Sequence, residues 1–249
     1  MRRLSYIVFI SVLYSACSGS STTPSTLPTL PTPSTPTTLP TPAGPPSRWD
    51  LNARGVPRFI THHYVDLTYI ERISRFRSGF GHDYSDDVER CRSMKHYFVP
   101  RYLSIDSSTM PVSSPMTGAV ERVREEWAGV QIEIQADEYP AFRVILFHVN
   151  AAIPLEEGTR LEAGQRIGTH VGNQTASDVA IVVDSTEGRR YVSWFDVITD
   201  GLMADYVVRG VTSRESAIIS RAERDSSPLT CNGEAFVSPG SLPNWVNLR

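Results

Sequence analysis

The fold is decided by Val130-Gln131-Ile132-Glu133-Ile134-Gln135 and by Phe142-Arg143-Val144-Ile145-Leu146-Phe147-His148. Apolar residues recur in both runs at every second position, which is the period of a β-strand with one face in a core. The run Ser177 to Val183 shows the same period, and glycine-bearing turns separate the runs. The sequence therefore predicts a mainly β domain, a β-sandwich or small barrel with peripheral helices.

The same alternation predicts which side chains share a strand face. His148 is expected on the face of the apolar Leu146, and Asp178 on the face of Ala180 and Val182. On this apolar strand His148 is either a core histidine with satisfied hydrogen bonds or a residue of a site. Asp178 either caps a turn or faces a pocket.

Helices are predicted at both ends of the domain. Asp66 is expected to cap a helix that carries Leu67 and Ile70, and Thr212 with Glu215 forms a capping box for a second helix. Together these signals place helical segments around a β-rich centre.

The first seventeen residues have the pattern of an export signal. A positive head is followed by an apolar run, Leu4 to Leu13, that is too short to span a bilayer as a mature helix. Small residues then precede Cys17, which resembles a bacterial lipoprotein box and predicts a lipid anchor on that cysteine. Ser18 favours the outer membrane as the destination. The alternative is cleavage by an ordinary signal peptidase, with no role for Cys17.

Residues 18–47 are almost entirely Ser, Thr and Pro and hold nine of the eighteen prolines of the chain. Such a composition cannot build a core and favours extended polyproline II. We expect a disordered stalk. Residues 48–249 then form one domain, long enough for a sizeable core.

Net charge bears on the choice of partner. The formal charge of the whole chain is −3, and it becomes more negative once Arg2 and Arg3 leave with the signal. No dense basic patch is present. The composition therefore argues against nucleic acid as a partner.

Cysteine usage agrees with export. The chain has three cysteines, Cys17, Cys91 and Cys231. If Cys17 carries the lipid, an oxidising compartment allows a disulfide between Cys91 and Cys231.

An ordered set of segments resembles the lysostaphin/LytM-type zinc endopeptidases. The set begins with His82 and Asp86 and continues through Ser114 to Val120, Val144 to Val149 and Leu155 to Gly168. The resemblance spans about residues 79–184 and implies that family's duplicated-hybrid-motif β-fold. It also implies a bacterial cell-envelope setting, with short peptide bridges or stems of the wall as the substrate class.

The resemblance further implies roles for individual residues. His82 and Asp86 match two zinc ligands, and His148 matches a histidine that assists the attacking water. The family's third ligand falls on Ala180, which has no donor atom, and the neighbouring catalytic histidine position holds Asp178. The sequence therefore predicts an altered, degenerate member of the family.

Catalytic zinc usually needs three protein ligands and one open position for water. Asp178 or His148 is the alternative third ligand, and two histidines with a carboxylate would suit zinc, manganese or iron. Zinc is therefore a candidate cofactor rather than an assured one. About twenty-five residues are inserted between Asp86 and Ser114, and they include Lys95-His96-Tyr97, a segment polar and aromatic enough to line a groove.

Simpler interpretations stand beside these. His82 and Asp86, four residues apart, are also spaced to form a hydrogen-bonded pair on a short helix at the surface. The other histidines lack a convincing partner in the sequence and are expected at the surface or in hydrogen bonds rather than as ligands. They are His62, His63, His96 and His170.

Three functions follow from this sequence. The favoured one is an exported envelope lipoprotein whose peptidase-like groove binds peptidoglycan or an envelope protein, or regulates a wall hydrolase, without hydrolysis. The second is an active, atypical metal-dependent peptidoglycan endopeptidase that uses His82, Asp86, His148 and Asp178. The third is a structural surface module held by its stalk.

Overall fold

Antiparallel strands form the body of this fold, as the alternating sequence runs predict. A computed structural model describes residues 44–101 and 105–249. Within these residues, eleven strands belong to one sheet that does not close into a barrel. The predicted signal, the lipid site at Cys17 and most of the predicted stalk lie outside the described residues. No described helix has the length and apolar character needed to cross a membrane.

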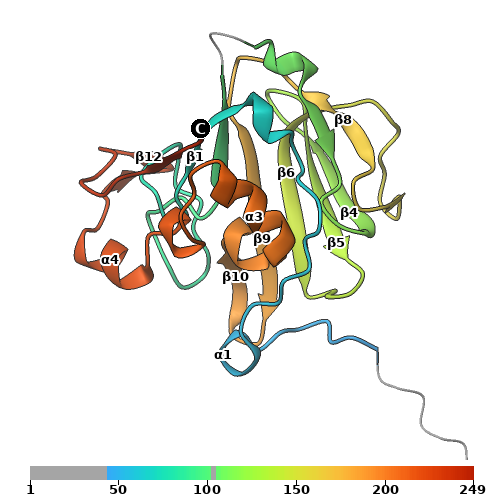
Figure 1. Cartoon of the computed structure of the whole chain (residues 1–249). Helices are drawn as coiled ribbons and strands as arrows, with labels where there is room; N and C mark the ends of the chain where they lie inside the picture. Colours follow the sequence, from blue (N-terminus) through green and yellow to red (C-terminus); the bar gives the residue numbers. More distant parts are fainter. Residues whose placement is uncertain (1–43, 102–104) are drawn as a thin grey trace, which may run out of the picture. The chain divides into compact units, whose positions relative to one another are not determined.

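The strands follow the order β13-β1-β2-β9-β6-β5-β4-β7, with β10 paired to β9 and with β8 joining β6 to β3. Figure 1 shows β9, β6, β5 and β4 side by side. A separate hairpin pairs β11 with β12. The bounds are β1 Ile70–Ser74, β2 His96–Pro100, β3 Pro111–Ser113, β4 Gly118–Glu125, β5 Val130–Ala136, β6 Phe142–Ala151, β7 Arg160–Leu161, β8 Arg166–His170, β9 Ser177–Ser185, β10 Gly188–Val192, β11 Cys231–Asn232, β12 Ala235–Phe236 and β13 Trp245–Asn247.

The central strands β6 and β9 are buried on both faces. Val144 and Val179 pack into the large hydrophobic core on one face, whereas Ile145 and Ala180 belong to a smaller apolar cluster on the other. Asp178 precedes Val179 and therefore lies on the face of the smaller cluster, as the alternation predicts. A carboxylate is thus placed at the edge of an apolar layer.

A bulge in β6 changes the predicted face of His148. Leu146 pairs with Ile132 and Val149 with Val130, so three steps along β6 match two along β5. The extra residue bends the strand, and His148 takes a left-handed φ of 59°. His148 is therefore turned away from the core face that strict alternation predicts, and it lines a cavity with Asp178 instead.

The helices are short and lie around the sheet. In the described part of the chain the α-helices are α1 Leu51–Arg54, α2 Trp194–Val197, α3 Asp200–Val208 and α4 Arg221–Ser226, and the 3₁₀ helices are η1 Leu67–Tyr69, η2 Ser107–Thr109 and η3 Glu215–Ala217. The predicted α-helix after Asp66 is wrong: Asp66 caps only the single turn η1, and the chain continues into β1. The predicted capping box at Thr212 is also wrong, because the box is formed by Ser220 and Glu223 at the start of α4.

The predicted disulfide between Cys91 and Cys231 is present, with a Cα–Cα distance of 5.7 Å. It joins the loop between β1 and β2 to the β11–β12 hairpin, across a sequence separation of 140 residues. A second contact supports this joint, since His82 forms a β-bridge with Ala235. The loop that carries His82 is therefore fastened at two points to the carboxy-terminal segment.

Candidate functional site

A cavity of ≈700 Å³ lies where β2, β6 and β9 meet the loop between β1 and β2. This volume is in the usual range of small-ligand sites. Aromatic side chains form much of its wall, and charged side chains converge inside it. The lining residues used below are His82, Tyr84, Lys95, Tyr97, Glu126, Trp127, Phe147, His148 and Asp178, together with Arg72, Thr175 and Glu234.

A buried ion pair occupies the polar centre of the cavity. Lys95 Nζ lies 2.8 Å from Asp178 Oδ2, and the two side chains are 3% and 2% exposed. The ammonium also lies 4.3 Å from the ring centroid of Phe147 and 4.9 Å from that of Tyr97. A carboxylate and aromatic faces both stabilise an ammonium group. Lys95 is thus held on several sides by groups that select cations.

The charges of this pair support each other against burial. Burial alone lowers the pKa of Lys95, but the Asp178 carboxylate and Tyr97 more than offset it, so the pKa is raised. Burial raises the pKa of the Asp178 carboxyl, and Lys95 opposes that shift. Lys95 therefore stays protonated at neutral pH and supplies the positive charge that Asp178 needs.

His148 lies between two carboxylates. Its Nε2 is 3.7 Å from Asp178 Oδ2, and its Nδ1 is 3.5 Å from Glu126 Oε2. Nδ1 is also 3.2 Å from the carbonyl oxygen of Ala128, to which it can donate. The bulge in β6 is what brings this ring into the cavity, so the strained backbone of His148 serves the site.

The predicted site residue His82 lines the cavity as well. Its Nδ1 lies 3.0 Å from the carbonyl oxygen of Asp83, to which it donates a hydrogen bond. The preceding Gly81 has a φ of 78°, and a Cβ there would fall 2.0 Å from the Tyr97 hydroxyl. The close contact between this loop and Tyr97 therefore requires glycine.

The predicted partner Asp86 has a different role. Its Oδ1 accepts hydrogen bonds from the amides of Val88 and Glu89, and its Oδ2 accepts from Arg190 Nε and the amide of Tyr191. Burial alone would raise the pKa of this carboxyl, but these hydrogen bonds lower it overall. Asp86 is not among the residues that line the cavity.

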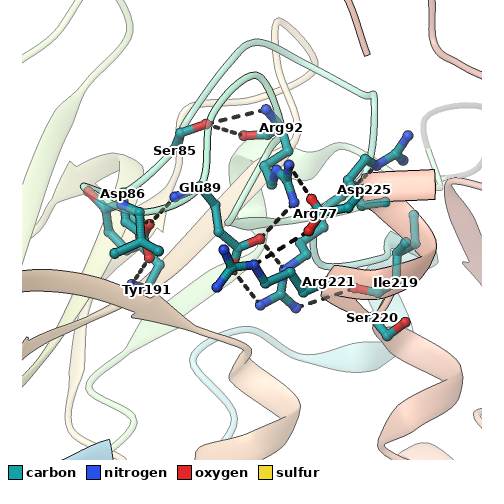
Figure 2. A network of polar contacts seen from close by, with 12 residues as sticks. Arg77, Ser85, Asp86, Glu89, Arg92, Tyr191, Ile219, Ser220, Arg221 and Asp225 are labelled. Carbon is teal, nitrogen blue, oxygen red and sulfur yellow. Dashed lines mark hydrogen bonds and ion pairs between the residues drawn. The ribbon is translucent and has the colours of Figure 1, made fainter. Parts of the chain in front are cut away.

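Figure 2 shows Asp86 in the polar network that holds the loop between β1 and β2. In the same network the buried Glu89 pairs with both Arg77 and Arg92, and Arg92 continues to Asp225 in α4. Asp86 therefore fixes the loop that presents His82. This corrects the interpretation of His82 and Asp86 as a pair of ligands or as a hydrogen-bonded pair on one helix.

These donors do not fit a zinc ion. Both oxygens of Asp86 are already hydrogen-bonded, Ala180 supplies no donor, and the carboxylate of Asp178 faces an ammonium that would repel a dication. Across residues 44–101 and 105–249, no group of three or more His, Cys, Asp or Glu side chains is placed to hold a metal ion. The cavity brings His82, His148 and Asp178 together without the fourth predicted residue.

The remaining histidines act in hydrogen bonds, as expected. His96 donates from Nδ1 to the carbonyl of Ser74 and accepts at Nε2 from the Ser193 hydroxyl. Burial lowers the pKa of His96 to about 4, so its ring is neutral. His63 Nε2 lies 3.0 Å from Asp205 Oδ2, in a separate pocket beside α3.

Comparison with known proteins finds similar solved structures at low sequence identity. No protein-family model matches the chain, and no curated protein matches it. Among solved structures, it is similar to a chain of the SpoIIQ–SpoIIIAH pore-forming complex, with 12% identity, a TM-score of 0.37, and coverage of 54% of this chain and 88% of the other.

Two peptidase structures are also similar. A zinc-containing peptidase from Vibrio cholerae has 20% identity and a TM-score of 0.36 over 55% of this chain and 39% of its own. A putative glycyl-glycine endopeptidase LytM from Ruminococcus gnavus has 16% identity and a TM-score of 0.32 over 48% and 57%. The chain thus spans 39% and 57% of the lengths of these two proteins. At these TM-scores the chemistry of the site rests on the residues of the cavity alone.

The sequence does not single out several residues that line the cavity, among them Lys95, Glu126 and Trp127. The sequence indicates Lys95 only as part of a polar and aromatic segment. Its partner, Asp178, is 83 residues away in the chain. Glu126 and Trp127 lie in the turn between β4 and β5, where no spacing links them to His148. An inserted lysine beside two aromatic residues was the only usable signal.

Proposed function

We propose that this protein is an exported cell-envelope lipoprotein whose cavity binds a peptide of the bacterial wall without hydrolysing it. The observation that carries the proposal is the Lys95–Asp178 pair, which puts an ammonium at the polar centre of a cavity of ligand size. Export, the lipid on Cys17 and the stalk belong to the proposal and rest on sequence pattern. Regulation of a wall hydrolase would follow from binding the same peptide.

The cavity suits a peptide better than a purely apolar ligand. Aromatic rings offer apolar contact, and the polar lining residues offer hydrogen-bond donors and acceptors. These polar residues are Lys95, His82, His148 and Glu126. An active metallopeptidase is the weaker alternative, because activation of water by a metal needs ligands that this cavity does not assemble. A purely structural module gives no reason for a buried charged pair to line a cavity.

We expect the protein to bind a synthetic wall-stem peptide, alanyl-γ-glutamyl-lysyl-alanine. Binding is measured by the fluorescence of Trp127, a residue that lines the cavity and is 74% exposed. Replacement Thr175→Trp should block the cavity and reduce affinity by about tenfold or more, since it fills space that the ligand needs. Calorimetry should report the same loss.

The matched control is Val208→Trp, which adds the same side chain at an exposed position of α3 outside the cavity. It should leave affinity unchanged. Mass spectrometry of the peptide after incubation should find it intact. No binding by the wild-type protein, or equal binding by both tryptophan variants, would show that the cavity is not the site.

A further inference from the structure

The carboxylates of the cavity are only partly compensated. Its lining contains Glu126, Asp178 and Glu234 but only two basic side chains that are always charged, Arg72 and Lys95. Lys95 is committed to Asp178, and Arg72 stacks on Trp245 with its guanidinium carbon 4.3 Å from the ring centroid. The lining therefore holds three carboxylates against two permanent cations, one of which is already paired.

Two buried carboxylate oxygens of this cavity's lining residues lack a hydrogen-bond donor. Asp178 Oδ1 and Glu126 Oε2 are both buried, and neither has a hydrogen-bond partner in the described part of the chain. Asp178 is almost fully buried, with its side chain 2% exposed. A buried acceptor without a donor is costly. Both residues line the same cavity, so these two oxygens indicate a ligand that brings donors.

The aromatic rings beside Glu126 favour a cationic donor on the ligand. Trp127 stands beside His148 with their ring centroids 5.6 Å apart, next to Glu126 in sequence. An exposed indole beside an uncompensated carboxylate favours a cation, because the ring face and the carboxylate both attract positive charge. The same combination already holds the ammonium of Lys95 within this cavity.

We infer that the ligand carries a primary ammonium group that pairs with Glu126 beside Trp127, while Asp178 Oδ1 accepts a second N–H from the same ligand. His148, 3.5 Å from Glu126 and 3.7 Å from Asp178, spans the gap between the two acceptors. The ligand class is a peptide with a free side-chain amine. This inference rests on the proposed function and specifies which part of the wall peptide is recognised.

The test compares the stem peptide alanyl-γ-glutamyl-lysyl-alanine with the same peptide acetylated on the lysine amine. The wild-type protein should bind the free amine about tenfold or more tightly than the acetylated form, since acetylation removes the charge and hence a charge-assisted hydrogen bond. Glu126→Gln should abolish that preference, because a neutral amide no longer favours the ammonium over the acetylated amine.

The matched control is Glu125→Gln, an exposed neighbour that does not line the cavity, and it should keep the full preference. Equal binding of both peptides by the wild-type protein would overturn the inference while the binding function stands. A preference that survives in Glu126→Gln would overturn it too. If neither peptide binds, the proposed function itself fails.

Discussion

Replacing Lys95 with methionine is expected to lower the free energy of unfolding by about 3–5 kcal/mol. The variant leaves the carboxylate of Asp178 buried without its cation, whereas methionine keeps much of the volume among the rings of Tyr84, Tyr97 and Phe147. The loss thus reports the uncompensated charge rather than a cavity. Urea unfolding followed by circular dichroism measures it.

The control is the double variant Lys95→Met with Asp178→Asn, in which neither charge remains. It should be clearly more stable than Lys95→Met alone, because the buried unpaired carboxylate is gone. If the single variant loses less than about 1 kcal/mol, as exposed ion pairs do, the pair is not the buried centre described here.

Removing the disulfide, with Cys91→Ser and Cys231→Ser together, is expected to lower the free energy of unfolding by about 5 kcal/mol in the chain-entropy model. The bridge closes a long loop, with a sequence separation of 140, so the unfolded chain gains much freedom when the bridge is lost. The paired change leaves no unmatched thiol from this bridge.

Mass mapping without reduction supplies the independent check, since it should find the two cysteines linked in the wild-type protein. Loss of the bridge should also weaken binding of the stem peptide, because Cys91 lies in the loop that presents His82. Two free thiols in the wild-type protein, or an unchanged midpoint of unfolding in the paired variant, would contradict this prediction.

Much of the β architecture follows from local sequence. The alternation in β5, β6 and β9 predicts strands at the observed places, since side chains on a pleated strand repeat every two residues. The prediction of a helix after Asp66 is wrong because strand pairing, and not the local pattern, decides the structure of this segment. Ile70 and Ile73 suit a strand, and pairing with β2 and β13 outweighed a weak helical pattern.

The site was harder to predict because it depends on contacts distant in sequence. The family resemblance indicates His82, His148 and Asp178, yet it could not show that both oxygens of Asp86 accept hydrogen bonds within the loop and from β10. It also could not show the bulge that turns His148 into the cavity. The role of Lys95 became evident only from its distance to Asp178.

The most direct test of the central claim is the zinc content of the purified protein, together with its effect on cell-wall suspensions. After equilibration with zinc and dialysis, the protein should retain less than one equivalent, and it should not clear the suspension. This result is expected because an ammonium stands beside Asp178 and the oxygens of Asp86 are engaged. One equivalent of zinc that disappears in both His82→Ala and Asp86→Ala would contradict the account.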